Sequence, residues 1–181
     1  MASMDGDWDD EEFNEADLRE EVDKIHILAH TNEHNEGDGD APPTNHWSCF
    51  LEISPQRSVE LDMIPGYGSD GLRGKLMVSS KQCAHTNKAI HKLSFWPANG
   101  RPKVEEIIRV INDNRLQEYT FTPEWEGCRF WIFTLVSKLE QRGIVQSASA
   151  NRVWNAVSYY WVNPAGFVAR PVKEGRFCSS G

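Results

Sequence analysis

The sequence has no long apolar run, no cluster of basic residues and no glycine-rich phosphate loop. None of its apolar stretches approaches the roughly 20 residues that span a bilayer, and its N-terminus is acidic where a signal peptide is basic. We therefore expect an intracellular, cytoplasmic protein with no membrane partner. Scattered Lys and Arg residues also argue against a nucleic-acid partner.

The four cysteines, Cys49, Cys83, Cys128 and Cys178, contain no CxxC pair. This spacing argues against a zinc ribbon or a redox pair, and in a reducing compartment it predicts free thiols. No cluster of metal-ligating side chains and no paired-carboxylate layout of a glycosidase stands out. The sequence therefore predicts no metal and no cofactor.

Negative charge is concentrated at one end of the chain. Of 181 residues, the first 40 hold 15 of the 27 acidic side chains but only 2 of the 19 basic ones. We interpret residues 1–23 as an acidic arm that is disordered or loosely docked, and residues 24–181 as a single domain, since this length supports one well-buried core. Oligomeric state is not readable from these features.

The first half of the domain has the patterns of strands. KIHILAHT at 24–31, HWSCFLEI at 46–53, SVELDMI at 58–64, GKLMVSS at 74–80 and KLSFW at 92–96 have strand composition. Within SVELDMI, apolar and polar residues alternate strictly, so Ser58, Glu60 and Asp62 share one face. The turn SPQR joins this strand to the one before it as a hairpin.

The second half changes to helical periodicity. We predict helices over about 102–114, from Cys128 to a stop at Gly143, and within ANRVWNAVSYYW up to Asn163 and Pro164, with ARPVKEGRF as a terminal strand. The second helix is apolar nearly all round, so it belongs in the centre of the domain. The predicted class is α+β: a mostly antiparallel sheet packed on a central buried helix.

Cys128 stands at the start of that central helix. A cysteine there can be a small apolar filler, or a thiol whose reactive thiolate form the helix dipole favours. A nucleophilic thiol needs an imidazole within hydrogen-bond reach. His46 is the candidate because it opens an apolar strand, whereas the other five histidines are interpreted as surface or hydrogen-bonded side chains.

The segments NHWSCFLEI, SVELDMIPG and EGCRFWIFTLVSKLEQRGI resemble, in this order, circularly permuted papain-like proteins. Lecithin retinol acyltransferase-like and NlpC/P60 proteins have this arrangement, in which the histidine strand precedes the cysteine helix. Residues from about 24 to 176, including VSYYW, also resemble a family of uncharacterised fungal proteins. The resemblance implies a permuted papain-like fold.

Carried over by position, the resemblance implies that Cys128 is the nucleophile, His46 the general base and acid, and Asp62 the group that orients His46. A four-residue SPQR turn would put Asp62 on the wrong face, so a bulge or a three-residue turn is needed. The motif also departs from the acyltransferase-like pattern at Gly127 and Arg129, which flank the cysteine.

A small-molecule substrate would need further contacts. Arg129 is a candidate for binding a carboxylate, and Trp47, Trp125 and Tyr160 are candidates for an aromatic pocket, although such aromatics can equally be core. We predict thiol-dependent acyl or amide chemistry, by a hydrolase or acyltransferase. Two alternatives stay open: a non-covalent cyclase or isomerase of fungal natural products, using His46 and Asp62 as acid and base, and a non-catalytic binding module.

Overall fold

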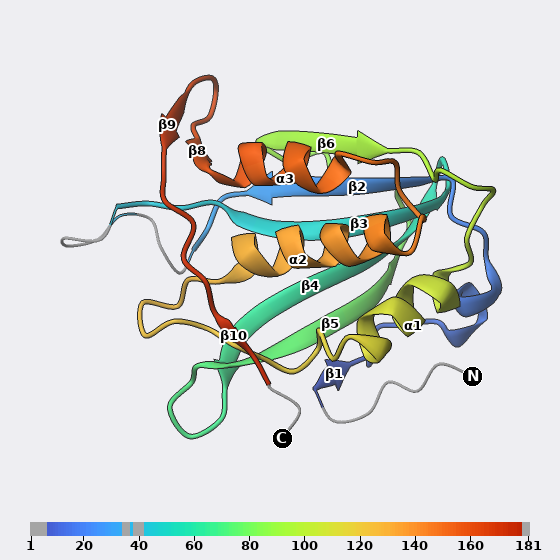
Figure 1. The fold of residues 1–181 in the computed structure, drawn as a ribbon, viewed down its shortest axis with the longest axis horizontal. Helices are drawn as coiled ribbons and strands as arrows, with labels where there is room; N and C mark the ends of the chain where they lie inside the picture. Colours follow the sequence, from blue (N-terminus) through green and yellow to red (C-terminus); the bar gives the residue numbers. More distant parts are fainter. Residues whose placement is uncertain (1–6, 34–36, 38–41, 179–181) are drawn as a thin grey trace.

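The computed structural model describes residues 7–33, 37 and 42–178, and Figure 1 shows their arrangement. The elements in the first half are β1 (Trp8–Asp9), the 3-10 helix η1 (Glu15–Arg19), β2 (Lys24–His30), β3 (His46–Ser54), β4 (Arg57–Tyr67), β5 (Arg73–Lys81) and β6 (His91–Phe95). Those in the second half are α1 (Val104–Asp113), β7 (Tyr119–Thr120), α2 (Cys128–Gln141), α3 (Ser149–Val157), β8 (Tyr159–Trp161), β9 (Phe167–Ala169) and β10 (Arg176–Phe177).

One twisted sheet organises the described part of the chain. Its strand order is β10-β7-β5-β4-β3-β2-β6, and every pair along this path is antiparallel. Strand β1 adds to β5 in parallel. The predicted α+β class with a mostly antiparallel sheet is therefore confirmed.

The two faces of the sheet differ in character. All three α-helices lie on one face, with α2 between α1 and α3 (Figure 1). Residues of β3 and β4 that point to this face, such as Leu51 and Leu61, are fully buried with Ile132 and Leu135 of α2 in one hydrophobic core. The opposite face carries the polar residues of the same strands, and we call it the polar face.

A bulge in the β3–β4 hairpin decides which residues reach the polar face. Ser54 pairs with Arg57 across the turn, but the register shifts after it, so that Glu52 pairs with Ser58 and Cys49 with Leu61. Without this shift, Asp62 would stand opposite Cys49 and point into the core. The bulge that the sequence required is thus present, and it moves Asp62 to the polar face.

The helices agree with the periodicity of the sequence except at one end. Helices α1 and α2 begin and end within about two residues of their predicted limits. Helix α3, however, ends at Val157 rather than continuing to Asn163, because Tyr159–Trp161 pairs with Phe167–Ala169 as a hairpin. Aromatic side chains favour strands, and Tyr159–Trp161 has a strand to pair with in Phe167–Ala169. Of the expected terminal strand over 169–177, only Ala169, at the end of β9, and Arg176–Phe177, which form β10, lie in strands; residues 170–175 do not.

Residues 7–23 are docked, contrary to the expectation of a loose acidic arm. Trp8 pairs with Leu76 of β5 and is buried, as is Leu18. The buried carboxylate of Asp17 accepts hydrogen bonds from Arg57 and from the Ser80 hydroxyl. The acidic composition favoured a loosely held segment. Buried apolar side chains and one buried ion pair nevertheless hold it against the domain. Residues 1–6 lie outside the described part.

No helix in the described residues is both long enough and apolar enough to cross a bilayer.

Because the N-terminal segment is docked, its buried tryptophan should contribute to the stability of the fold. Trp8→Ala should lower the free energy of unfolding by about 3–5 kcal/mol, since it empties a buried site. Trp96→Ala is the matched control, because Trp96 is 61% exposed, and it should change stability by less than about 0.5 kcal/mol. Urea denaturation followed by circular dichroism measures both. Equal stability of Trp8→Ala and the unsubstituted protein would mean that the segment is not anchored.

Candidate active site

His46 and Asp62 meet on the polar face. His46 is the first residue of β3, and Asp62 lies on the neighbouring strand β4. Continuing the register from Cys49 and Leu61 sets Ser48 opposite Asp62, so His46 and Asp62 are diagonal neighbours. The Nε2 atom of His46 lies 2.6 Å from Oδ1 of Asp62, and both side chains are about one-fifth exposed.

Cys128, the first residue of α2, approaches the start of β3 from the helix side of the sheet. Its thiol donates to the backbone oxygen of Asn45, the residue before β3, with Sγ 3.9 Å from that oxygen. The thiol also acts on His46 electrostatically and is one of the groups that raise the pKa of His46. Since Nε2 of His46 faces Asp62, Nδ1 is the ring nitrogen not bonded to Asp62. The structure therefore brings Cys128, His46 and Asp62 together from three separate elements.

The glycine before the cysteine has a steric reason. Gly127 has φ of 151°, in the region that favours glycine, and a Cβ atom there would lie 2.9 Å from the hydroxyl of Tyr119. That hydroxyl donates to the backbone oxygen of Gly127, 2.9 Å away. The close approach of Tyr119 thus fixes the chain just before α2, and with it the position of Cys128.

The electrostatics of His46 favour its charged form. Burial alone lowers the pKa of His46, but the negative charge of Asp62, the hydrogen bond with Asp62 and the neighbouring Cys128 outweigh it and hold that pKa well above its usual range. A thiolate on Cys128 would face a positive ring on one side and the N-terminus of a helix on the other.

Asn45 holds a second element against this site. Its side-chain amide donates to the backbone oxygen of Trp161 and accepts from the backbone N–H of the same residue, at 3.1 and 2.7 Å. This pair of bonds attaches β8 beside the start of β3. Asn45, which is buried, therefore contacts the thiol through its main chain and β8 through its side chain.

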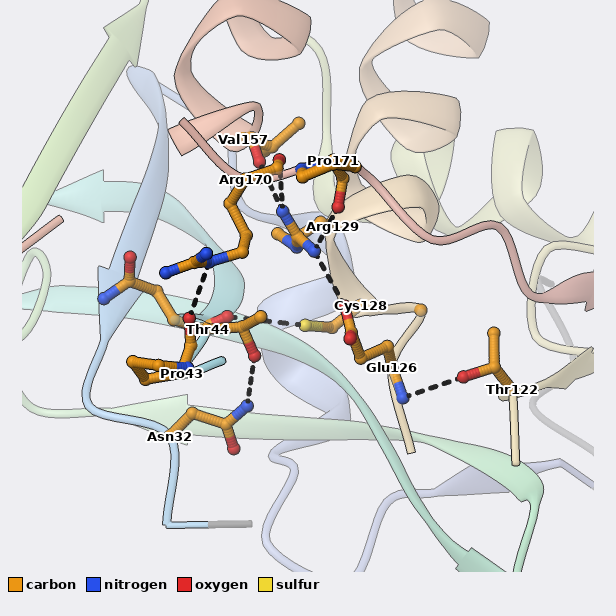
Figure 2. Close-up of polar contacts among 12 residues, drawn as sticks. Asn32, Pro43, Thr44, Thr122, Glu126, Cys128, Arg129, Val157, Arg170 and Pro171 are labelled. Atoms are coloured by element: carbon orange, nitrogen blue, oxygen red, sulfur yellow. Dashed lines mark hydrogen bonds and ion pairs between the residues drawn. The ribbon is translucent and has the colours of Figure 1, made fainter. Parts of the chain in front are cut away.

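Arg129 does not face a substrate site. It is 2% exposed, and Figure 2 shows its guanidinium enclosed by protein oxygens. Its terminal nitrogens donate to the backbone oxygens of Val157, Arg170 and Pro171 and to the carboxylate of Glu126, at 2.7–3.0 Å. The expected contact with a substrate carboxylate does not fit this position, because the helix start needs Arg129 to anchor the chain after β9.

The three predicted aromatic contacts lie apart from one another. Trp47 is fully buried on the core face, next to His46 in sequence but on the opposite side of the sheet. Trp125 is partly exposed and packs beside Gly71 in the β4–β5 connection. Tyr160 lines a small cavity of about 240 Å³ with Asn45 and Thr44. Of these three aromatic residues, only Tyr160 thus lies near Cys128, His46 and Asp62. Trp47 points to the opposite face from His46, because successive side chains of a strand alternate.

Sequence reasoning missed a second set of polar residues beside the first. A cavity of about 850 Å³ lies on the polar face and is lined by His30, Phe50, Glu60 and Lys81, among others. His30 is adjacent to the predicted site, with its ring centroid 6.3 Å from that of His46. The alternation in KIHILAHT and SVELDMI was the available signal, because it sets His30 on the same face as Glu60 and Asp62 once the strands pair.

The other histidines of the described residues are held by protein contacts. His26 lies between Ser94 and Glu52, His85 between the Thr86 oxygen and Lys92, and His91 stacks on Trp161. His34 lies outside the described residues. No group of three or more His, Cys, Asp or Glu side chains in the described ranges is arranged to hold a metal ion.

The fold and this site define an α+β domain with a bonded histidine–aspartate pair and a cysteine that acts on the histidine electrostatically. The chain belongs to the family described as a domain of unknown function, DUF7770, whose model matches residues 25–178. No curated protein and no solved structure matches the chain.

The two neighbouring histidines should titrate on opposite sides of pH 6.5. Burial and the positive charge of His46 lower the pKa of His30 to about 4, whereas the pKa of His46 is raised. His46 therefore contributes stability that is complete below pH 6.5 and is lost as pH rises through its folded-state pKa. His30 contributes stability that is lost as pH falls from 6.5 toward about 4. Imidazole NMR signals measure both midpoints.

Asp62→Asn should move only one of these midpoints strongly. It removes the carboxylate that raises the pKa of His46, so the His46 midpoint should fall. Asp113→Asn is the control, because Asp113 pairs with Arg142 on the surface, and it should leave His46 unchanged. A His46 signal that titrates below pH 6.5 in the unsubstituted protein would contradict the assigned electrostatics.

Proposed function

We propose that this protein is a thiol-dependent hydrolase or acyltransferase that acts on a small molecule through Cys128, His46 and Asp62. One observation carries the proposal: the imidazole of His46 bonds the carboxylate of a neighbouring strand and interacts electrostatically with the thiol of a helix start. Nucleophile, base and orienting group in this order are the arrangement that activates a cysteine.

Each group has a role in the proposed reaction. The Cys128 thiolate attacks a carbonyl carbon, and the imidazolium of His46 gives its proton to the leaving amine, alcohol or thiol. His46 then takes a proton from water or from an acceptor as this attacks the acyl-cysteine. Asp62 holds Nε2 throughout. The backbone N–H of Cys128 belongs to the first turn of α2, where amides lack helical partners, and it would donate to the oxyanion.

The same proposal includes a permuted papain-like arrangement. The histidine strand β3 precedes the cysteine helix α2 in the chain, and α2 packs against the sheet that holds the histidine. These are the features on which the resemblance to NlpC/P60 and lecithin retinol acyltransferase-like proteins rests. An intracellular location belongs to the proposal as well, since none of the four cysteines, all of which the structure describes, forms a disulfide.

One observation favours a second candidate, a non-covalent cyclase or isomerase of natural products. Cys128 is only 7% exposed, whereas the large cavity is lined by His30 and Glu60, beside the His46–Asp62 pair. An acid and a base beside a cavity suffice for such chemistry. A non-catalytic binding module would use the cavity alone.

Reactivity of the thiol tests the first candidate. At pH 6, iodoacetamide should alkylate Cys128 at least about 10-fold faster than Cys83 or Cys178, since a histidine and a helix N-terminus beside a thiol favour its nucleophilic form. Cys49, which is buried and whose pKa burial raises, should not react in the folded protein. Peptide mass spectrometry after timed quenching gives the four rates.

Substitution of the histidine supplies the control for this experiment. His46→Gln should slow alkylation of Cys128 and leave Cys83 and Cys178 unchanged. If Cys83 and Cys178 react first in the unsubstituted protein, or if His46→Gln has no effect, Cys128 is a packed core thiol. An activity that survives Cys128→Ala but disappears in His46→Ala would establish the non-covalent candidate instead.

A further inference from the structure

The connection between β5 and β6 forms a roof over part of the polar face. Strand β5 lies on one side of β4, β3 and β2, and β6 lies on the other, so residues 82–90 have to cross one face of these strands. They cross the polar face and are attached to it near both ends. The Ser58 hydroxyl donates to the backbone oxygen of Cys83 at 2.6 Å, and the N–H of Ile90 donates to the backbone oxygen of Ala29 at 2.7 Å. The cavity of about 850 Å³ is lined both by this connection and by the strands beneath it.

Positive charge is concentrated in this connection and in the strands that flank it. Between residues 71 and 104 the chain has seven Lys or Arg side chains and no Asp or Glu, although the whole chain has an excess of acidic residues. Lys81, at the end of β5, and Lys88, in the connection, line the cavity. Clefts lined by charges of one sign attract ligands of the opposite sign. The roof therefore brings positive charge over a face whose strands supply the carboxylates.

The carboxylates that β3 and β4 present on the polar face already have partners within the protein. Each lies 2.6–3.2 Å from a basic side chain: Glu52 from His26, Glu60 from Lys81 and Asp62 from His46. A carboxylate that is bonded to a neighbouring basic group attracts a further cation less than a free one does. These acidic residues therefore do not make the cavity a site for cations.

Two ammonium groups of the roof have no carboxylate partner. Lys92 donates to Nε2 of His85, 3.0 Å away. Nδ1 of His85 lies 3.0 Å from the backbone oxygen of Thr86, and since a carbonyl oxygen only accepts, Nδ1 carries the proton and Nε2 the lone pair. His85 is thus a neutral partner, which leaves the charge of Lys92 uncompensated. Within the ranges that the structure describes, no carboxylate lies within ion-pair distance of Lys88 either.

We propose that this cavity binds an organic anion, whose carboxylate or phosphate group is held by Lys88 with the added charge of Lys92, and whose apolar part lies against Phe50. The cavity falls in the range of small-molecule sites, roughly 300–1,000 Å³, and is far larger than an inorganic ion needs. The Thr86 hydroxyl accepts from the N–H of Lys88 at 3.2 Å, so its own proton is available to the anion. This binding site stands independently of the thiol chemistry of Cys128.

A set of probes of similar shape tests the sign of the ligand. Benzoate and phenyl phosphate carry an anionic group on a ring, benzamide is the neutral analogue of benzoate, and benzylamine is a cationic one. Titration into the isotope-labelled full chain, followed by amide NMR shifts, gives the affinities, which should be millimolar for ligands of about ten non-hydrogen atoms. We expect at least one of the two anions to move the amides of residues 83–88 and to bind at least about 5-fold more tightly than benzamide or benzylamine. The tighter of the two distinguishes a carboxylate site from a phosphate site.

Removal of the two ammonium charges locates the site. Lys88→Gln and Lys92→Gln should each weaken binding of the tighter anion by about 3-fold, the effect of one charge pair near a surface, and the double variant by about 10-fold. Both lysines are exposed, so the substitutions should leave the fold intact. Lys138→Gln is the control, because Lys138 lies in α2 on the helix side of the sheet. It changes the net charge equally and should leave the affinity unchanged.

Glu33 supplies a second test of sign. It is exposed and lines the cavity, so its charge opposes an anionic ligand. Glu33→Gln should therefore tighten binding of the anionic probe by about 2-fold. Weaker binding in Glu33→Gln, together with a preference for benzylamine, would show that the cavity takes cations and would overturn the proposal.

Three further results would also overturn the anion site. They are equal affinities for the tighter anion and for benzamide, an unchanged affinity in the Lys88 and Lys92 double variant, and no amide shift with either anion at about 50 mM, well above the dissociation constant expected of such small ligands. None of these results bears on the proposed thiol chemistry, since Cys128 and His46 are unchanged throughout. Failure of the iodoacetamide experiment would in turn leave the anion site standing.

Discussion

The extra residue in the β3–β4 hairpin is the constraint on which the site depends. A strand has a period of two, so a slip of one residue exchanges its faces. With the bulge between Glu52 and Ser54, Val59, Leu61 and Met63 enter the core, and the acidic residues between them face outward. Without it, Asp62 would be an uncompensated charge under α2. The bulge therefore turns the apolar residues of β4 into the core and at the same time places the carboxylate of Asp62 beside His46.

The cysteine is positioned from the opposite layer by contacts that leave it little freedom. Tyr119 closes on Gly127, and Arg129 ties the first turn of α2 to the ends of α3 and β9. Buried guanidinium groups are costly unless every hydrogen bond is made, and here four protein oxygens meet the two terminal nitrogens. The residues that flank Cys128 in sequence are thus structural supports, and the chemistry is confined to the thiol.

On the polar face, titratable side chains with different pKa values lie close to one another. Strands β2, β3 and β4 bring two histidines and two carboxylates together. Burial lowers the pKa of His30, whereas Asp62 raises the pKa of His46. Burial and Asp62 also raise the pKa of Glu60. Groups whose environments separate their pKa values are suited to opposite roles as acid and base. This separation is a physical basis of the proposed thiol chemistry.

Local pattern determined much of this protein. Alternation in SVELDMI fixed the faces of β4, and apolar periodicity fixed α1 and α2. The helix start at Cys128 and the strand start at His46 marked two candidate site residues that interact electrostatically in the structure. Tertiary structure decided the rest. Whether Trp47 or Arg129 meets solvent, whether residues 7–23 dock, and whether His30 joins the site depend on strand partners distant in sequence. A side chain's residue type sets what chemistry it can do, but only the pairing of strands and the packing of helices sets what it faces.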